Sequence, residues 1–322
     1  MRGIRITTPG GPEVLALGDL PDLEPARGEV LVKVEAAGVN RADLLQRMGR
    51  YPPPPGTRED VPGLEFAGAV AGLGGETDKW CVGDRVMGLL AGGGYAEYVA
   101  VPALHVVRVP EAWSWEEAAS VPEVFLTAHD ALEQVGLAAR DRVLIHAVAS
   151  GVGVALVQLA KAADATVAGT SRSGDKLERM RAWGLDRGIH VEGVFQPGPD
   201  LRDWADVICD LVGGAYLPGS LAAAAPKGRI IVIGLTAGRS AEIDLGLLLR
   251  KRLTLVGTVL RSRSGEEKAA LVRSFTEHVM PLFASGAVRP VVDRVFAMAD
   301  ASAAHRYMEE SRNVGSIVLR WD

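Results

Sequence analysis

The sequence is poor in cysteine and lacks an excess of positive charge. Its two cysteines, Cys81 and Cys209, form no C-x-x-C pair. A zinc site built from several cysteines is therefore excluded, and the low cysteine content suits a reducing, cytoplasmic compartment. The formal net charge of −5 gives no basic surface for a polyanion, so nucleic acid is not expected as a partner.

The chain also lacks a long, purely apolar run. The N-terminus, MRGIRITTPGG, has no apolar segment of the kind found in signal peptides, and we expect it to be the start of the mature fold. The most apolar long window, Val143 to Ala160, contains His146, Ser150, Gln158 and two glycines. Such a segment is a poor membrane span, and no membrane association is expected.

What the chain does have is enough apolar material for two cores, because 48% of its 322 residues are hydrophobic. Up to about residue 109, short β-rich runs alternate with glycine and proline, which predicts a mainly β domain. The run YPPPPG, Tyr51 to Gly56, predicts a stiff polyproline loop within it.

After about residue 122 the pattern changes to alternating strands and helices, which predicts a parallel sheet with helices on both faces. The segment from Phe275 to Asp322 returns to a mixed pattern and is expected to rejoin the first domain. We therefore predict an α/β protein with a β-rich domain, residues 1–121 and 264–322, around a doubly wound domain, residues 122–263. The strands expected in the doubly wound domain are Val143–His146, Thr166–Gly169, Val207–Asp210, Arg229–Gly234 and Leu253–Val259.

The segment HAVASGVGVALVQLAKA indicates a nucleotide-binding turn. Gly151 and Gly153 stand where an apolar strand turns into a helix, and glycine there lets the backbone approach phosphate groups. A tight strand-to-helix junction of any α/β protein is the alternative. The amphipathic helix that follows, and a second strand at the expected distance, favour a dinucleotide.

The end of that second strand favours NADPH over NADH. An NAD site typically has an acidic residue there, which accepts from the ribose 2′-hydroxyl, whereas NADP needs cations and hydroxyls around its 2′-phosphate. This sequence offers Ser171, Arg172 and Lys176, with no carboxylate until Asp175. Solvated charges at the start of a helix are the alternative interpretation.

Six motifs together resemble a known family. They are AGVNRADLLQRMGRYPPPPG, VPGLEFAGAV, GGGYAEYV, HAVASGVGVALVQLAKA, GTVLRSRS and RNVGSIVLRW. In this order, over essentially the whole chain, they resemble the quinone oxidoreductase branch of the medium-chain dehydrogenase/reductases, and most of all its p53-inducible type. The resemblance implies a GroES-like domain around a Rossmann domain, NADPH-dependent reduction of quinones, and a homodimer joined through the edge strand Arg252–Leu260.

The resemblance also implies that the chain needs no metal. Zinc-dependent members of the superfamily place a cysteine and a histidine where this sequence has Asn40 and Leu64. Neither replacement is a zinc ligand of that kind, and Glu65 alone would not hold the ion. A quinone is electron-poor enough to accept reducing equivalents without a Lewis acid, so the loss of zinc indicates an easier acceptor.

The acceptor site is predicted near the segment NRADLLQRM. If this segment is helical, Asn40 and Asp43 fall on one polar face together with Gln46 or Arg47. An ion pair between Asp43 and Arg47 on a solvated face is the alternative. Tyr51 could donate a hydrogen bond to a quinone oxygen and stack on its ring. In the resembling family, positions matching Asn40, Asp43 and Tyr51 line the acceptor site.

Cofactor contacts are expected from the turn, from strand ends and from positions that approach the cofactor in the family. In the turn, Ser150 replaces the middle glycine of the family pattern, and Ser316 replaces a lysine common in the family. The expected cofactor residues are Thr127, Ala147, Ser150, Gly151, Val152, Gly153, Ser171, Arg172, Lys176, Gly234, Leu235, Leu260, Arg261 and Asn313.

Two other functions remain open at this stage. Reduction of an activated C=C bond in an enone or enoyl compound uses the same hydride donor and a similar site. A non-catalytic NADPH-binding protein is the third possibility, but it would not need the polar acceptor pocket that Asn40 and Tyr51 indicate.

Overall fold

The computed structural model describes residues 1–322, which pack into two compact units. The β-rich unit comprises Met1–Leu126, Leu260–Met280 and Pro290–Asp322, and the parallel-sheet unit comprises Thr127–Val259 and Pro281–Arg289. The first boundary lies within helix α3 (Pro122–Gln134). The domain limits expected from the sequence stay a prediction, since compact packing does not test whether each part folds alone.

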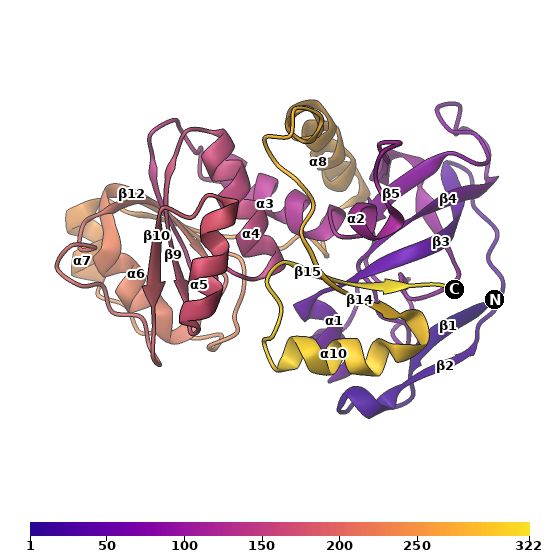
Figure 1. The fold of residues 1–322 in the computed structure, drawn as a ribbon, viewed down its shortest axis with the longest axis horizontal. Helices are drawn as coiled ribbons and strands as arrows, with labels where there is room; N and C mark the ends of the chain where they lie inside the picture. The colour runs from indigo at the N-terminus through magenta and orange to yellow at the C-terminus, as the bar shows by residue number, and fades with distance from the viewer. The chain divides into compact units, whose positions relative to one another are not determined.

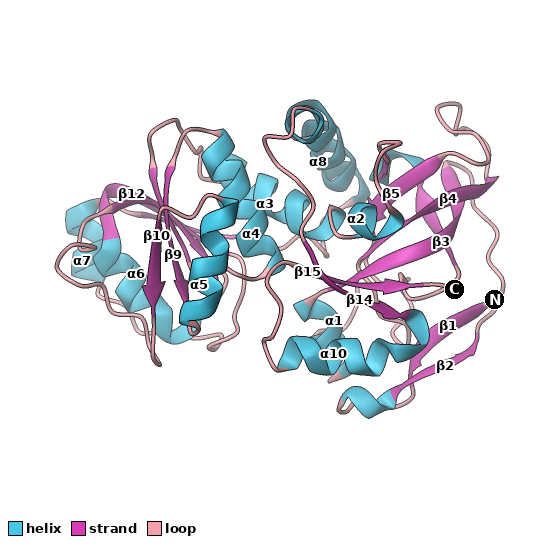
Figure 2. Ribbon diagram, viewed as in Figure 1, coloured by secondary structure: helices cyan, strands magenta, loops and turns pink.

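The β-rich unit is built on a seven-stranded sheet of order β14-β15-β3-β4-β5-β7, with β6 paired to β3 (Figure 2). All pairs are antiparallel except β14 with β15. In the long central strand β3, Val30, Val32 and Val34 are buried and alternate with less buried residues, as a sheet with one face on the core requires. The strands are β1 (Arg2–Ile6), β2 (Leu15–Asp19), β3 (Glu29–Val39), β4 (Glu65–Leu73), β5 (Arg85–Leu89), β6 (Tyr98–Pro102), β7 (Val106–Arg108), β14 (Val292–Ala297) and β15 (Ser316–Arg320).

Short helices accompany this sheet. Helix α10 packs on β14 and β15, while α2 packs on β3 and β4. β1 and β2 form a separate two-stranded sheet. The helices of this unit are α1 (Arg41–Arg47), α2 (Trp115–Ala119), α8 (Gly265–His278) and α10 (Ala301–Glu309), whereas α9 (Met280–Ala284) belongs almost wholly to the parallel-sheet unit.

The parallel-sheet unit has six strands in the order β10-β9-β8-β11-β12-β13, all parallel. Helices α4 and α5 lie on one side of β9 and β10, and α6 and α7 lie on the other (Figure 1). This is the Rossmann order, in which the chain reverses direction across the sheet between β8 and its neighbour β11. The elements are β8 (Arg142–Ile145), α4 (Gly151–Ala162), β9 (Thr166–Ser171), α5 (Gly174–Met180), β10 (Arg187–His190), β11 (Ala205–Asp210), α6 (Leu217–Ala223), β12 (Ala224–Val232), α7 (Leu245–Lys251) and β13 (Thr254–Gly257).

The predicted fold class is confirmed. All five strands expected in the doubly wound domain are present, with limits that differ by a few residues. The short strand β10 was not expected, because its sequence RGIH has a single large apolar residue and carries no strand pattern.

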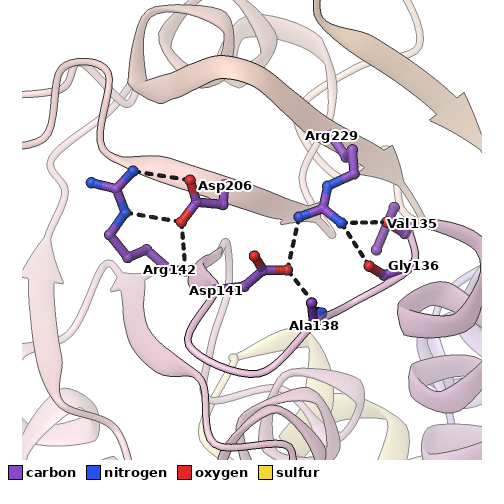
Figure 3. A network of polar contacts seen from close by, with 7 residues as sticks. All are labelled: Val135, Gly136, Ala138, Asp141, Arg142, Asp206 and Arg229. Carbon is purple, nitrogen blue, oxygen red and sulfur yellow. Dashed lines mark hydrogen bonds and ion pairs between the residues drawn. The ribbon is translucent and has the colours of Figure 1, made fainter.

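Two arginine–carboxylate pairs join the amino ends of the parallel strands (Figure 3). Arg142, the first residue of β8, forms two parallel bonds to the carboxylate of Asp206 in β11, each 2.9 Å long. Arg229 in β12 contacts Asp141 at 2.7 Å and also donates to two carbonyl groups that follow α3. These contacts lie at the amino ends of the strands, opposite the carboxyl ends where ligands bind in open α/β sheets.

No helix of the protein combines the length and the apolar character needed to cross a membrane.

The edge strand β13 carries exposed apolar side chains. It pairs only with β12, and Leu255 is 40% exposed. An open apolar edge favours pairing with another strand.

We expect a homodimer in which β13 pairs with its copy in a second chain. The variant Leu255→Asp should place a charge at that edge and give the mass of a single 34.0 kDa chain in light scattering at micromolar concentration. Leu17→Asp, at a similarly exposed leucine of β2, is the matched control and should stay dimeric. A wild-type monomer would contradict the expectation.

Candidate active site

The nucleotide-binding turn connects β8 to α4. Ser150 is the N-cap of α4 in an extended conformation, and its Oγ accepts a hydrogen bond from the Gly153 amide at 3.1 Å. Serine therefore replaces the expected glycine because it caps the helix. Helix geometry leaves the amides of Gly151 and Val152 without an intrahelical acceptor. These amides, at the positive end of the helix, suit a phosphate group.

Gly153 is required by the close approach of the helix to the turn. A Cβ atom at this position would lie 2.5 Å from the carbonyl oxygen of Val148 and 2.7 Å from that of Ala147. Any side chain would therefore push α4 away from the turn. Ala147 itself has φ of +51°, a left-handed conformation that turns the chain sharply after β8. The turn thus has the shape that dinucleotide binding needs.

His146, beneath this turn, has a structural role. It is fully buried, with Nδ1 3.0 Å from Thr170 Oγ1 and Nε2 3.0 Å from Ser220 Oγ. Because Ser220 donates its own proton to the Tyr216 carbonyl, Nε2 must donate to Ser220, and Nδ1 accepts from Thr170. Burial lowers the pKa of His146 to about 4, so the ring is neutral and holds two strand ends together.

The residues expected around the 2′-phosphate lie where β9 ends. The Ser171 Oγ accepts from the Ser173 amide at 3.1 Å, and the Arg172 carbonyl accepts from His190 Nε2 at 3.1 Å. Ser173 caps α5 through the amide of Lys176. Since β9 runs parallel to β8, both strands end at the same edge of the sheet.

The remaining expected cofactor residues divide between the two units. Gly234 and Leu235 follow β12 and belong to the parallel-sheet unit together with Thr127 of α3, whereas Leu260, Arg261 and Asn313 belong to the β-rich unit. Asn313 donates to the Gly315 carbonyl at 2.7 Å, which shapes the turn before β15. The cofactor roles of all these residues stay predictions.

In the β-rich unit, the polar face of α1 is buried. Asp43 and Arg47 are both fully buried, so the alternative of an ion pair between them on a solvated face is wrong. Each has its own partners. Asp43 accepts from the amides of Asn40 at 2.8 Å and Gly63 at 3.0 Å, while Arg47 donates to the Gly10 carbonyl and to Glu309.

A directed chain of hydrogen bonds connects these two groups. Arg47 can only donate, so Nδ1 of His305, 3.4 Å from Nη1, must be an acceptor. Nε2 of His305 then carries the proton and donates to the hydroxyl of Tyr95 at 3.2 Å. The Tyr95 hydroxyl donates in turn to Asp43 Oδ2 at 3.3 Å. Burial lowers the pKa of His305 to about 3 and raises that of Asp43 to about 6.

A second buried carboxyl group lies beside the first. Glu65 accepts from Asn40 Nδ2 at 2.7 Å and from the amide of Glu123 at 2.8 Å. A Cβ atom on Gly38 would lie 2.0 Å from Glu65 Oε1, so glycine makes room for this carboxyl. Burial raises the pKa of Glu65 to about 8, against the two hydrogen bonds. Burial also raises the pKa of Glu123, and the charges of Glu65 and Asp43 add to this effect.

The side chains at the zinc positions do not fit a zinc ion. Asn40 is bonded to Glu65, and Leu64 is packed in the core. Carboxamide nitrogen and an aliphatic side chain are not zinc ligands, which leaves Glu65 as a single carboxylate.

Sequence reasoning missed several members of this cluster. Glu65 was considered only as an insufficient metal ligand, and Tyr95 was given no role beyond its place in the motif GGGYAEYV. His305 and Glu123 were not singled out, because each is distant in sequence from the residues it contacts. Arg47 and His305 are 258 residues apart in the sequence, so no local pattern reveals their contact.

The parallel-sheet unit has a Rossmann-type sheet and a turn suited to phosphate. The β-rich unit has a buried polar cluster around α1. Together these features are typical of nucleotide-dependent oxidoreductases. Residues 26–111 match the family model of the alcohol dehydrogenase GroES-like domain, and residues 151–277 match that of the zinc-binding dehydrogenases. The chain is an oxidoreductase of the medium-chain dehydrogenase/reductase superfamily and belongs to that superfamily over its whole length.

The relatives include quinone oxidoreductases and polyketide synthases. A quinone oxidoreductase of Pseudomonas aeruginosa is 32% identical, covering 98% of both chains. The polyketide synthase GfsB of Streptomyces halstedii is 34% identical over 91% of this chain, but the chain spans only 5% of that protein.

The similar solved structures include a quinone oxidoreductase and an enoyl reductase. The Escherichia coli quinone oxidoreductase complexed with NADPH has a TM-score of 0.88 at 27% identity, covering 99% of this chain and 100% of that one. The CurK enoyl reductase has a TM-score of 0.85 at 27% identity, covering 100% of this chain and 99% of that one.

The buried carboxyl of Glu65 predicts a pH-dependent stability. Its pKa is about 8 in the folded protein against an ordinary 4.5, so the folded state binds more protons between these values. The free energy of unfolding should therefore fall as pH rises from 4.5 to 8. Between pH 5 and pH 8, the free energy of unfolding measured in urea should fall by on the order of 2–3 kcal/mol less in Glu65→Gln than in the wild type.

The matched control is Glu24→Gln, at an exposed glutamate of the same unit, which should keep the wild-type pH dependence. Equal slopes in the wild type and Glu65→Gln would contradict the prediction.

Proposed function

We propose that the protein is an NADPH-dependent, zinc-independent reductase of quinones or similarly electron-poor acceptors. One observation carries the proposal. The positions of the zinc ligands hold a carboxamide–carboxyl pair, Asn40 with Glu65, and a core leucine, Leu64. An acceptor reduced at such a site must be activated by hydrogen bonds rather than by a Lewis acid, and a quinone meets that requirement.

The parallel-sheet unit supplies the cofactor-binding residues of this proposal. NADPH fits the turn because the free amides of Gly151 and Val152 suit a pyrophosphate and because Gly153 keeps the helix close to the turn. Arg172 and Lys176 would hold the 2′-phosphate. Bound NADPH supplies a hydride. The relatives' complexes with NADPH support this choice of cofactor.

Tyr51 is the proposed hydrogen-bond donor to the acceptor. Burial raises the pKa of its phenol, although the charge of Arg261 opposes this shift. The hydroxyl therefore keeps its proton at neutral pH and can donate it to a carbonyl oxygen on which negative charge develops. Asn40 and Asp43 are proposed to line the same acceptor site.

Reduction of an activated C=C bond is the second candidate. The similarity to the CurK enoyl reductase and to polyketide synthases favours it. Such a substrate also presents a conjugated carbonyl oxygen, which Tyr51 would bind in the same way.

The proposal is tested by NADPH oxidation, followed at 340 nm, with a panel of quinones and a panel of enones. We expect turnover with quinones that exceeds turnover with enones and is unchanged by a chelator. Faster reduction of enones would favour the second candidate. Cofactor binding without turnover of either panel would indicate a non-catalytic NADPH-binding protein.

Selectivity for NADPH should depend on Arg172. Loss of one charge-assisted contact to phosphate costs roughly 1.5–3 kcal/mol, so Arg172→Ala should weaken NADPH binding by about ten- to a hundredfold. NADH affinity should barely change. Isothermal titration measures both, with Arg202→Ala as the matched control, because Arg202 is an exposed arginine of the same unit. Equal affinity of the wild type for both cofactors would disprove the assignment.

Two variants test Tyr51. A neutral hydrogen bond is worth roughly 0.5–1.5 kcal/mol, so Tyr51→Phe should reduce kcat/KM for quinones by up to about tenfold. Tyr51→Ala also removes the ring and should cost more. NADPH affinity should stay the same, because the proposed role of Tyr51 is to bind the acceptor and not the cofactor.

Tyr98→Phe, at a half-buried tyrosine of β6, is the control and should keep wild-type kinetics. Wild-type kcat/KM in Tyr51→Ala would place the acceptor site elsewhere.

A further inference from the structure

Arg261 is an almost fully buried cation of the β-rich unit. Only 6% of its surface is exposed, and burial lowers the pKa of its guanidinium. A buried cation is tolerated only where its N–H groups are bonded and its charge is balanced. The carboxylate of Asp43 balances part of the charge, since it raises the pKa of Arg261.

Three of the five N–H groups of Arg261 donate to protein oxygens. Nε donates to the Ala91 carbonyl at 2.7 Å, Nη1 to the Tyr51 carbonyl at 3.0 Å, and Nη2 to Gln46 Oε1. One side chain thus joins α1, the Tyr51 loop and the segment after β5.

The orientation of Gln46 shows that the arrangement is specific. Its Nε2 donates to the carbonyls of Glu59 at 3.0 Å and Val61 at 3.3 Å, which leaves Oε1 to accept from Arg261. A guanidinium cannot accept a hydrogen bond, so the opposite orientation of the amide would lose all three contacts. The Lys268 ammonium also donates to the Arg261 carbonyl at 2.8 Å, which fixes the backbone of the arginine.

Arg261 holds the ring of Tyr51 as well as its backbone. The guanidinium carbon lies 4.8 Å from the centre of the phenol ring, within the range of a cation–π contact. The carbonyl bond and the ring contact together restrict both the loop and the side-chain torsions of Tyr51. The following prolines restrict the loop further.

We propose that Arg261 is a positioning residue of the acceptor site, acting through Tyr51. It fixes the phenol in place before the acceptor binds, and its charge makes the phenol a stronger hydrogen-bond donor. This inference rests on the proposed reductase function. It differs from the sequence-based expectation that Arg261 contacts the cofactor, because that role would use the guanidinium to bind NADPH.

Kinetics of three variants separate the two roles. Arg261→Met should lower kcat/KM for the quinone at least tenfold. The loss should be divided between kcat and KM in the same way as in Tyr51→Ala. The Kd for NADPH should stay within twofold of the wild-type value. Arg261→Lys keeps the charge without the planar fork and should recover part of the loss. The double variant Arg261→Met/Tyr51→Ala should be no slower than Tyr51→Ala.

A tenfold weaker NADPH complex in Arg261→Met, or losses that multiply in the double variant, would overturn the proposal. Arg50→Met, at an exposed arginine next to Tyr51, is the matched control and should behave as the wild type. Should Arg261→Met not fold, Arg261→Lys is judged by the same two criteria.

A measurement without substrate distinguishes failure of the proposed reductase function from failure of the proposed role of Arg261. If the wild type reduces neither quinones nor enones, that function fails. The urea midpoints of Tyr51→Ala, Arg261→Lys and the double variant then decide whether the two side chains are coupled. Non-additive shifts support positioning of Tyr51 by Arg261, whereas additive shifts overturn it.

Discussion

Burial of the Asp43 carboxyl beneath α1 is the constraint around which the polar part of the β-rich unit is organised. A buried carboxylate needs several donors, and Asp43 has two amides and a phenol. Each donor imposes a further requirement, because the Tyr95 hydroxyl is oriented by His305, which in turn accepts from Arg47. The geometry of α1 therefore depends on a chain of groups from three distant segments, and removal of any member would cost a neighbouring buried polar group one of its hydrogen bonds.

The parallel-sheet unit was the part most predictable from the sequence. Its strands are apolar runs at regular spacing, and the turn before α4 combines glycine with a helix start, so local pattern is enough to identify both. The α1 segment shows the limit of the same method. The i, i+3 spacing of Asn40 and Asp43 correctly indicates one polar face, but the usual rule that polar faces are solvated fails here. The partners that make burial possible, Gly63, Tyr95 and His305, come from elsewhere in the chain and cannot be inferred from periodicity.

Arg261 illustrates a second limit. Its motif resembles one that approaches the cofactor in the family. Such a resemblance indicates which position of the chain matches, but it does not indicate which groups the side chain contacts. The guanidinium contacts Gln46, Tyr51 and Ala91, none of which is near it in sequence. Gln46, in contrast, was one of two residues, with Arg47, expected on the polar face of α1, and its amide oxygen accepts a hydrogen bond from Arg261.

The polar cluster of the β-rich unit carries buried charge on Asp43 and Arg261 rather than on Glu65. A zinc ion bound to Glu65 would favour its carboxylate form, whereas the neutral amide of Asn40 offers only a hydrogen bond. Burial then dominates, and a pKa of about 8 keeps a proton on Glu65 at neutral pH. One buried positive charge of this region is the guanidinium of Arg261, which donates to neutral oxygens and stacks on a phenol. Because a guanidinium cannot polarise a carbonyl as a Lewis acid does, its effect on an acceptor would pass through the hydrogen bond of Tyr51, and such a site suits acceptors that are already electron-poor.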